Sequence, residues 1–336
     1  MKKYKLTNEH KTITRWLGRE EIESKLYRIE ALIDFNDIKK GDLGGWVESE
    51  LNLSQDGLCW IYDENSTVSD KAIVSGNAKI TGFSSVNGFC KIYDNATINS
   101  SDIRDTSEVF GNAEITDSSV SGESTIFDNA KVKNSHVIGD GRYSEEYTKQ
   151  KLQIYGNSQL LGVRIDGVPH IYENATLDKG ISIEHSPRIY GRSILRGQVK
   201  PDNIFSAEAT LFILDDTEIF GNAVIEAKKK DEKECSLFIK NSARIYGNSH
   251  IVGSGSINGR VRIYDYAKIN GLFHIDDHCE IFGETSISGK FKTWLFGHIK
   301  ISGVTFIRAD KKTISLEGRK NIKNKTITRN LFLGLF

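Results

Sequence analysis

The sequence predicts an all-β protein built as a left-handed parallel β-helix, and three observations support that prediction. First, the phrase Ile-Tyr-Asp-Asn-Ala-Thr-Ile at 92–98 returns in altered form along most of the chain. Second, the copies that begin at 74, 92, 109 and 126 follow one another at intervals of 18, 17 and 17. Third, the two isoleucines of the phrase are six positions apart, so three such units account for the interval of 18. Fixed periods of this kind are typical of solenoids.

Each six-residue unit contains an inward pair and a turn. The aliphatic residue is predicted to point inward, and the residue two before it is small, as in Cys90 before Ile92 and Ser107 before Val109. Positions two apart on a strand share one face, so the pair should fill the interior of the coil. The Gly-Asn or Asp-Asn pair that follows supplies turn chemistry, because Gly, Asn and Asp tolerate left-handed backbone.

The repeat also predicts three domains. Residues 1–58 do not follow the period, and alternating apolar residues at 27–33 indicate a β-rich N-terminal cap. Residues 59–308 form the predicted β-helix, and 309–336 form a C-terminal cap.

Three insertions into the β-helix are predicted where the spacing of the phrase lengthens. The copies that begin at 126 and 154, at 189 and 219, and at 219 and 245 are separated by much more than one regular coil. We therefore expect loops near 138–150, 196–207 and 227–236, on the surface of the coils.

Composition narrows the class of protein. Lys+Arg and Asp+Glu are both 45, and this zero formal net charge weighs against a nucleic-acid partner. The chain has no apolar run long enough to span a membrane, so a cytoplasmic protein is expected. The four cysteines lack metal-ligand spacing, and three of them (Cys59, Cys90 and Cys279) stand two positions before a phrase-opening isoleucine, where they should be buried and reduced.

An aromatic residue follows the first aliphatic residue of most copies. Ten of these aromatics are predicted to form a ladder, and Tyr62 holds the same place in an earlier copy: Tyr93, Phe110, Phe127, Tyr155, Tyr172, Tyr190, Phe220, Tyr246, Tyr264 and Phe282. Neighbouring coils stack about 4.8 Å apart, so the rings could stack and stiffen the turns. Alternatively, they form a contact stripe for a second subunit, an extended polymer or a glycan, which makes a homo-oligomer possible.

Four histidines are predicted to point outward, because each directly precedes an inward aliphatic residue: His136, His170, His250 and His274. An outward histidine can act as a general base, which must lie within reach of the group that loses its proton. His136 is the preferred catalytic candidate, because it adjoins the first predicted insertion with Arg142, Tyr143 and Glu146. The sequence shows no metal cluster and no Gly-rich phosphate loop.

The repeated phrase resembles the hexapeptide of bacterial acyltransferases, commonly Ile-Gly-Asp-Asn-Val-x-Ile, with an aromatic residue in place of the glycine. The segments 26–35, 41–50 and 57–63, together with 314–318 and 327–329, are similar to the YdcK-like family. That resemblance implies a single-stranded left-handed β-helix of the hexapeptide-transferase superfold. Members are often labelled acetyltransferases, and the resemblance implies acetyl-CoA as the donor if this chain is one.

Two functions remain open from the sequence. The preferred prediction is a solenoid scaffold or binding protein that presents the aromatic ladder to a partner subunit or an extended ligand. The alternative is a CoA-dependent acyltransferase, specifically an acetyltransferase, that uses an outward histidine on a coil edge. Because fold does not imply function, the choice depends on the geometry of the sites.

Overall fold

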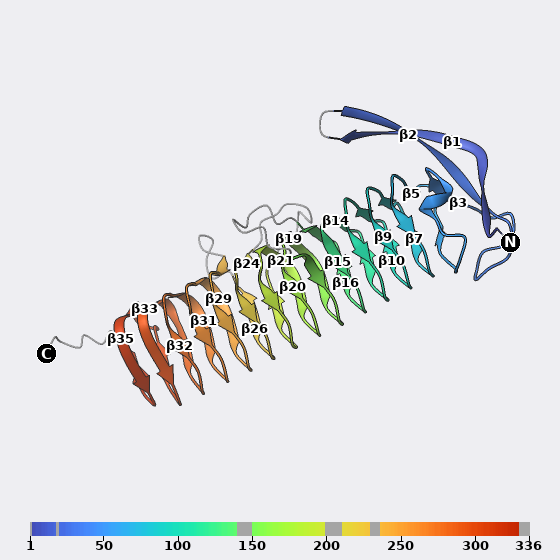
Figure 1. Ribbon diagram of the computed structural model, residues 1–336. Coiled ribbons are helices and arrows are strands. Elements are labelled where there is room, and N and C mark those ends of the chain that lie inside the picture. Colours follow the sequence, from blue (N-terminus) through green and yellow to red (C-terminus); the bar gives the residue numbers. More distant parts are fainter. Residues whose placement is uncertain (1, 18–19, 140–149, 199–209, 229–235, 329–336) are drawn as a thin grey trace. The chain divides into compact units, whose positions relative to one another are not determined.

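The computed structural model describes residues 2–17, 20–139, 150–198, 210–228 and 236–328, and with one exception the regular elements among them are β-strands joined by turns (Figure 1). The exception is a 3-10 turn at Glu50–Asn52. The all-β parallel β-helix predicted from the repeat is confirmed. The predicted loops near 138–150, 196–207 and 227–236 lie mostly outside the described residues. In the described part of the chain, no helix is long and apolar enough to span a membrane.

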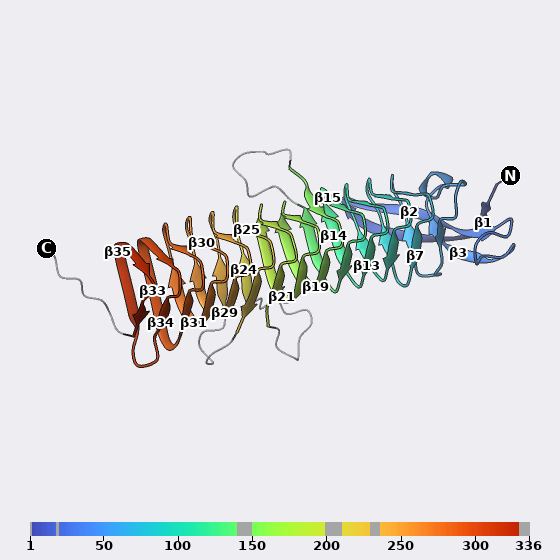
Figure 2. The same cartoon turned by 90° about the horizontal axis from the view of Figure 1, so that it is seen from below.

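The chain divides into two compact units. The first contains 1–140 and 151–157, and the second contains 141–150 and 158–336. In both, Figure 2 shows short strands of successive coils lying side by side.

The first unit begins with an antiparallel hairpin. Strands β1 (Tyr4–Leu17) and β2 (Glu20–Ala31) pair from Tyr4 opposite Ala31 to Leu17 opposite Glu20. Strand β2 also pairs antiparallel with β3 (Leu43–Val47), and β3 pairs in parallel with β5. The last strand of the cap is therefore also a strand of the coil.

The remaining strands of the first unit form three-sided coils. They are β4 (Trp60–Ile61), β5 (Thr67–Val68), β6 (Ile73–Val74), β7 (Lys79–Thr81), β8 (Ser85–Val86), β9 (Lys91–Ile92), β10 (Thr97–Asn99), β11 (Asp102–Ile103), β12 (Glu108–Val109), β13 (Glu114–Thr116), β14 (Ser119–Gly122), β15 (Ser124–Ile126), β16 (Lys131–Lys133), β17 (His136–Gly139) and β18 (Leu152–Ile154). From β4 to β15, each strand pairs in parallel with the third strand after it, as β9, β12, β15 and β18 do. Three strands therefore make one coil.

The second unit has the same architecture, and several of its strands are longer than those of the first unit's coils. They are β19 (Gln159–Gly167), β20 (His170–Ile171), β21 (Thr176–His185), β22 (Arg188–Ile189), β23 (Ile194–Arg196), β24 (Leu211–Ile213), β25 (Glu218–Ile219), β26 (Val224–Ala227), β27 (Leu237–Ile239), β28 (Arg244–Ile245), β29 (His250–Ile257), β30 (Arg262–Ile263), β31 (Lys268–Ile275), β32 (Glu280–Ile281), β33 (Ser286–Ser302), β34 (Phe306–Arg308), β35 (Ile314–Lys323) and β36 (Thr326–Ile327). Parallel pairing continues to β36, beyond residue 308 where the repeat weakens.

The interior of each coil contains the predicted pairs of aliphatic and small residues. Ile92 and Ile98 are fully buried, and so are Ala96 and Cys90. Cys59, Cys90 and Cys279 are free and buried, as predicted. Burial raises the pKa of the Cys90 and Cys279 thiols to about 12, so both stay protonated at neutral pH.

We expect the buried thiols to resist alkylation in the folded protein. Alkylation requires the thiolate, and Cys90 and Cys279 are neither exposed nor ionised. Peptide mass spectrometry after treatment with N-ethylmaleimide should show Cys90 and Cys279 modified only when denaturant is present. Rapid labelling of either residue in native buffer would contradict this placement.

The corners of the coils follow the predicted turn chemistry. Asp94 and Asp128 have φ of 56° and 59°, and Gly111 between them has φ of 68°. The Oδ2 atom of Asp94 accepts a hydrogen bond of 3.2 Å from the Gly111 N–H on the next coil. Beside it, Asn95 Nδ2 donates to Asn112 Oδ1 at 3.1 Å. Corner residues therefore connect successive coils as well as turning the chain.

Candidate functional site

The ten predicted aromatics form stacked columns in both units. In the first unit, the ring centroids of Tyr93, Phe110, Phe127 and Tyr155 are 4.7, 5.0 and 4.8 Å apart in succession. In the second unit, the rings of Tyr172, Tyr190, Phe220, Tyr246, Tyr264 and Phe282 are 4.8, 4.9, 4.7, 4.9 and 4.9 Å apart. All ten side chains are half-buried. Their faces pack on one another, so mainly ring edges meet the solvent.

Tyr62 does not share this column. Its backbone N–H bonds to the carbonyl of Ile80, which aligns Tyr62 with Thr81 on another side of the coil. Its hydroxyl instead donates to Asp37 Oδ1 at 2.8 Å, and burial together with this bond raises the pKa of Tyr62 to about 12. The repeated phrase does not reveal that Tyr62 lies outside the column, because the phrase has the same form on different sides of the coil.

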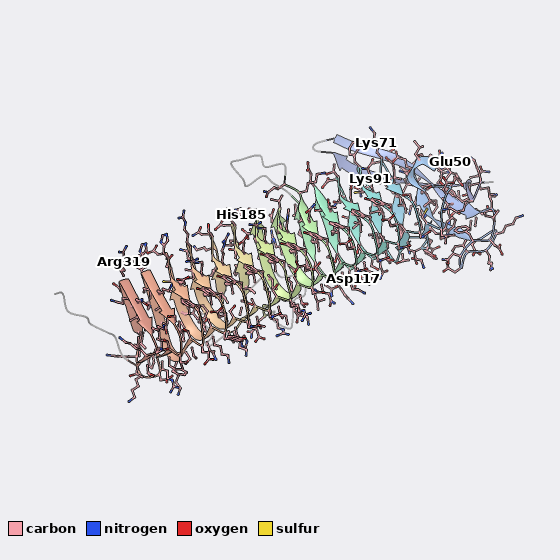
Figure 3. The ribbon with its side chains drawn as sticks, turned by 60° about the horizontal axis from the view of Figure 1, so that its bottom comes forward. Glu50, Lys71, Lys91, Asp117, His185 and Arg319 are labelled. Carbon is pink, nitrogen blue, oxygen red and sulfur yellow. The ribbon has the colours of Figure 1, made fainter. Side chains whose placement is uncertain are left out.

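Ion pairs flank the ladder of the second unit. Glu218 is buried and pairs with Arg188 and, at 2.9 Å, with Arg244. Two coils beyond Arg244, Glu280 accepts a 3.0 Å hydrogen bond from the Tyr264 hydroxyl. In the first unit, Lys91 (labelled in Figure 3) pairs with Glu108 at 2.9 Å. These contacts hold the edge of the ladder in place.

His136, the preferred catalytic candidate from the sequence, lies exposed on β17. Its parallel partner on β14 is Ser119. The neighbouring Arg142, Tyr143 and Glu146 lie outside the described residues. The catalytic role of His136 therefore stays a prediction.

His274 lies at the centre of a more complete arrangement on the second unit. It is half-buried on β31, where its parallel partners are Ser256 on β29 and Trp294 on β33. Its Nδ1 atom is 2.8 Å from the Ser256 hydroxyl oxygen, within hydrogen-bond distance. Its ring stacks on the Trp294 indole with centroids 4.4 Å apart. The histidine is therefore held between a polar and an aromatic neighbour.

Further aromatic side chains lie on neighbouring coils, in the row of His274 or beside Trp294. Phe212 and Phe238 precede Ser256 in the same outward row and stack 4.6 Å apart. Trp294 is 43% exposed, and Phe296, two positions further along β33, is 52% exposed. We call Phe238, Ser256, His274, Trp294 and Phe296 the His274 patch.

The cationic side chain of Lys292 also contacts the patch, with its Nζ atom 5.2 Å from the centre of the Trp294 ring. Among the described residues, no group of His, Cys, Asp and Glu side chains could hold a metal ion. The patch therefore offers a base, a hydroxyl, aromatic surface and a positive charge.

The sequence identifies His274 as outward but does not identify its partners. Ser256 precedes His274 by the interval of one regular coil, so that contact could have been suggested by the repeat. Trp294 follows His274 by two more positions than a regular coil, because β33 shifts its register against β31 between Gly271 and Phe273. A single irregular coil is therefore enough to prevent the repeat from predicting that Trp294 lies next to His274.

The comparison with protein-family models gives no match. Among curated proteins, the chain is similar to the protein named "Uncharacterized acetyltransferase YdcK" of Escherichia coli strain K12. The two are 37% identical over 227 residues, which cover 68% of this chain and 67% of the relative. With the β-solenoid fold and the N-terminal and C-terminal motifs, this likeness shows that the chain belongs to the YdcK-like family of β-helix proteins.

Proposed function

We propose that the His274 patch is an acyl-transfer site in which His274 acts as the general base. The observation that supports this most directly is the 2.8 Å contact between His274 Nδ1 and the Ser256 hydroxyl. A hydrogen bond at one ring nitrogen fixes the tautomer and the orientation of an imidazole. When the Nδ1–H group donates to Ser256, Nε2 carries a lone pair and can accept a proton from an acceptor hydroxyl or amine.

The surroundings of the imidazole suit this role. Stacking on Trp294 restricts the motion of the His274 ring, and half-burial limits the water around it. A base that is already oriented loses little freedom when the acceptor binds. Ser256 acts in this proposal as a positioning residue.

The chemistry of the patch fits acetyl-CoA, the donor suggested by the name of the relative. When bound, acetyl-CoA would supply an activated acyl thioester. Trp294 and Phe296 would offer apolar surface to its nucleotide and pantetheine parts, and the Lys292 ammonium would offer a charge to its phosphates. The cytoplasm, predicted from the sequence, is a compartment in which this donor would be available.

Binding of the donor is tested by thermal unfolding. A ligand that binds only the native state stabilises the protein against unfolding. At a ligand concentration of 100 times Kd, the free energy of unfolding rises by about 2.7 kcal/mol. We expect acetyl-CoA to raise the Tm of the wild-type protein, and Trp294→Ala to reduce that rise. Phe83→Ala, a change at a 76% exposed side chain of the first unit, serves as the control and should leave the rise intact. No rise in the wild-type protein at millimolar acetyl-CoA would contradict the proposed function.

A second candidate function, a binding scaffold, is favoured by the aromatic columns. Their ring edges form a continuous partly exposed stripe within each unit, which could contact a second copy of the chain or another partner. This function and acyl transfer can exist in one protein, because the columns and the His274 patch use different side chains.

Replacing Tyr93, Phe110 and Phe127 together by serine should separate a binding role from a structural one. Each lost stacked pair is expected to reduce stability by about 0.5–1.5 kcal/mol beyond its buried area. If the stripe binds a second copy, sedimentation should also show a smaller assembly than in the wild-type protein. Phe83→Ser with Phe89→Ser, at exposed positions outside the column, is the matched control. Unchanged assembly in a folded triple variant would leave the ladder with a structural role only.

A further inference from the structure

A polar pocket lies on the first compact unit, and it has a volume of about 380 Å³. Small-molecule sites usually have volumes of about 300–1,000 Å³. Lys79 and Thr97 are parallel partners on β7 and β10 (Figure 1), and Asn77 and Asn95 stand two positions before them. The lining is completed by residues from two other segments, and we call the whole set the Asn77 pocket: Asn36, Leu58, Asn77, Lys79, Asn95 and Thr97.

The N-terminal cap supplies Asn36 through a tight turn. Phe35 and Ile38 exchange backbone hydrogen bonds of 3.0 and 2.9 Å, so only two residues connect them. Asn36 has φ of 47°, which asparagine tolerates better than most residues. The turn is fixed to the coils, because the Phe35 ring packs edge-on against the buried Trp60 with centroids 5.5 Å apart. This wall of the pocket is therefore in place before a ligand binds.

Several polar atoms of the pocket have no partner among the residues that the structure describes. Asn77 begins a column of asparagines, because Leu58 holds its place on the preceding coil. Its Nδ2 atom donates to Asn95 Oδ1 at 3.0 Å, but no described residue donates to Asn77 Oδ1. Within the same ranges, the Lys79 ammonium forms no ion pair and the Thr97 hydroxyl forms no hydrogen bond. The pocket therefore offers both an acceptor and donors to a ligand.

The positive charge of Lys79 is offset by carboxylates. Its Nζ atom lies 5.9 Å from the centre of the Tyr62 ring, and the Tyr62 hydroxyl donates to Asp37 Oδ1 at 2.8 Å. That hydrogen bond, with a smaller contribution from Lys79, holds the pKa of Asp37 below its usual value. A second carboxylate, Asp94, directly precedes Asn95. The pocket is therefore poorly suited to an anion such as a phosphate, and its polar groups favour a neutral ligand.

The available groups match a sugar better than a peptide. An extended peptide needs an unpaired strand edge, but the backbone N–H groups of Asn77, Lys79 and Thr97 donate to carbonyls of the next coil. A sugar ring carries several hydroxyl groups, and each can donate and accept a hydrogen bond. The side chains of the pocket can bond to such hydroxyls, and Leu58, which is 41% exposed, offers apolar surface to the C–H face of the ring.

From this arrangement we propose that the Asn77 pocket binds one neutral pyranose unit of a sugar. Asn77 Oδ1 accepts a hydrogen bond from one sugar hydroxyl, and the Lys79 ammonium donates to another. Leu58 packs on the C–H face of the ring. The inference does not depend on acyl transfer at His274, because the pocket belongs to the first unit and shares no residue with the His274 patch.

Saturation-transfer NMR of the full chain tests this site, with the methyl glycosides of glucose, galactose and mannose as neutral probes. We expect at least one of them to bind at millimolar concentration, and methyl glucuronide, which adds a carboxylate, to bind more weakly than methyl glucoside. The double variant Asn77→Ala with Lys79→Ala should raise the Kd of the bound glycoside about tenfold or more, as expected for the loss of two hydrogen bonds.

The matched control is Asn129→Ala with Lys131→Ala. These two residues hold the same places on the coil that contains β16, outside the pocket, and all four side chains are exposed. Both double variants should stay folded, and the control should bind the glycoside as the wild-type protein does. Equal loss in the two variants, tighter binding of the glucuronide, or no binding of any neutral glycoside by the wild-type protein would overturn the proposal. Loss of the acetyl-CoA-induced rise in Tm in the pocket variant alone would assign the pocket to the donor, and would also overturn it.

Discussion

Replacing His274 by alanine is expected to reduce acetyl transfer by about 10²–10⁴-fold, the usual contribution of a positioned general base. The reduction should appear in kcat, because the lost group acts in the transition state, whereas the KM for acetyl-CoA should change little. The rate is measured as release of the CoA thiol, with water as the acceptor. Ser256→Ala should reduce the rate less, because it removes the group that orients the base and leaves the base itself.

His136→Ala is the matched control for this prediction. Like His274, His136 directly precedes an inward aliphatic residue, but it is exposed where His274 is half-buried, and it belongs to the first compact unit whereas His274 belongs to the second. We expect the His136→Ala variant to retain the wild-type rate. Loss of activity in His136→Ala with full activity in His274→Ala would contradict the proposed site and support the prediction made from sequence.

A large loss of stability is expected when a glycine of the second unit, Gly253, is replaced. Gly253 has φ of 145°, and a Cβ atom at this position would lie 1.9 Å from the carbonyl oxygen of Gly271 on the next coil. Because that oxygen belongs to the backbone of a paired strand, it cannot move without disturbing the backbone hydrogen bonds between the coils. Gly253→Ala should therefore reduce the free energy of unfolding by about 3 kcal/mol or more, equivalent to roughly 4 °C in Tm.

Gly318→Ala provides the comparison. Gly318 has φ of 79°, but a Cβ atom added there would have no other atom within 4 Å. Only backbone strain opposes this change, at about 1–2 kcal/mol. Thermal unfolding followed by circular dichroism should give a Tm for Gly253→Ala that is well below the Tm of Gly318→Ala. Equal Tm values would show that the close approach of the coils at Gly253 is relaxed in solution.

The coil itself could be predicted from the sequence because its determinants are local and repeated. The same kinds of residue recur at three positions of each copy, represented by Ile92, its small partner Cys90 and the turn at Asp94. All three favour the same coil structure. The stacking of Tyr93 on Phe110 follows directly from the regular spacing of the two copies of the phrase.

Other contacts depend on the side chain chosen at one position of the coil. A ladder of buried serines is an example, in which Ser84 Oγ accepts the N–H of Ser101 at 3.2 Å and Ser101 Oγ accepts the N–H of Ser118 at 3.1 Å. The sequence marks these residues only as small and inward. Their hydrogen bonds across coils could not be predicted, because alanine or cysteine fills the same place elsewhere.

The His274 patch is the least predictable feature. Its parts come from several strands, and a bulge in the pairing of β31 with β33 moves Trp294 away from the position that a coil of regular length would give it. The histidine is visible in the sequence as an outward residue, but its value as a base depends on Ser256 and Trp294. The period treats His136, His170, His250 and His274 alike, and the sequence favours His136 only because that residue adjoins a predicted insertion.

Hydrogen–deuterium exchange of the full chain with and without acetyl-CoA tests the central claim most directly, because it locates the donor without knowledge of the acceptor. We expect slower exchange upon binding in β29, β31 and β33, where Ser256, His274 and Trp294 lie. We expect no change in β14 and β17, which carry Ser119 and His136. Protection confined to β14 and β17, or none anywhere at saturating acetyl-CoA, would contradict the assignment of the His274 patch as the acyl-transfer site.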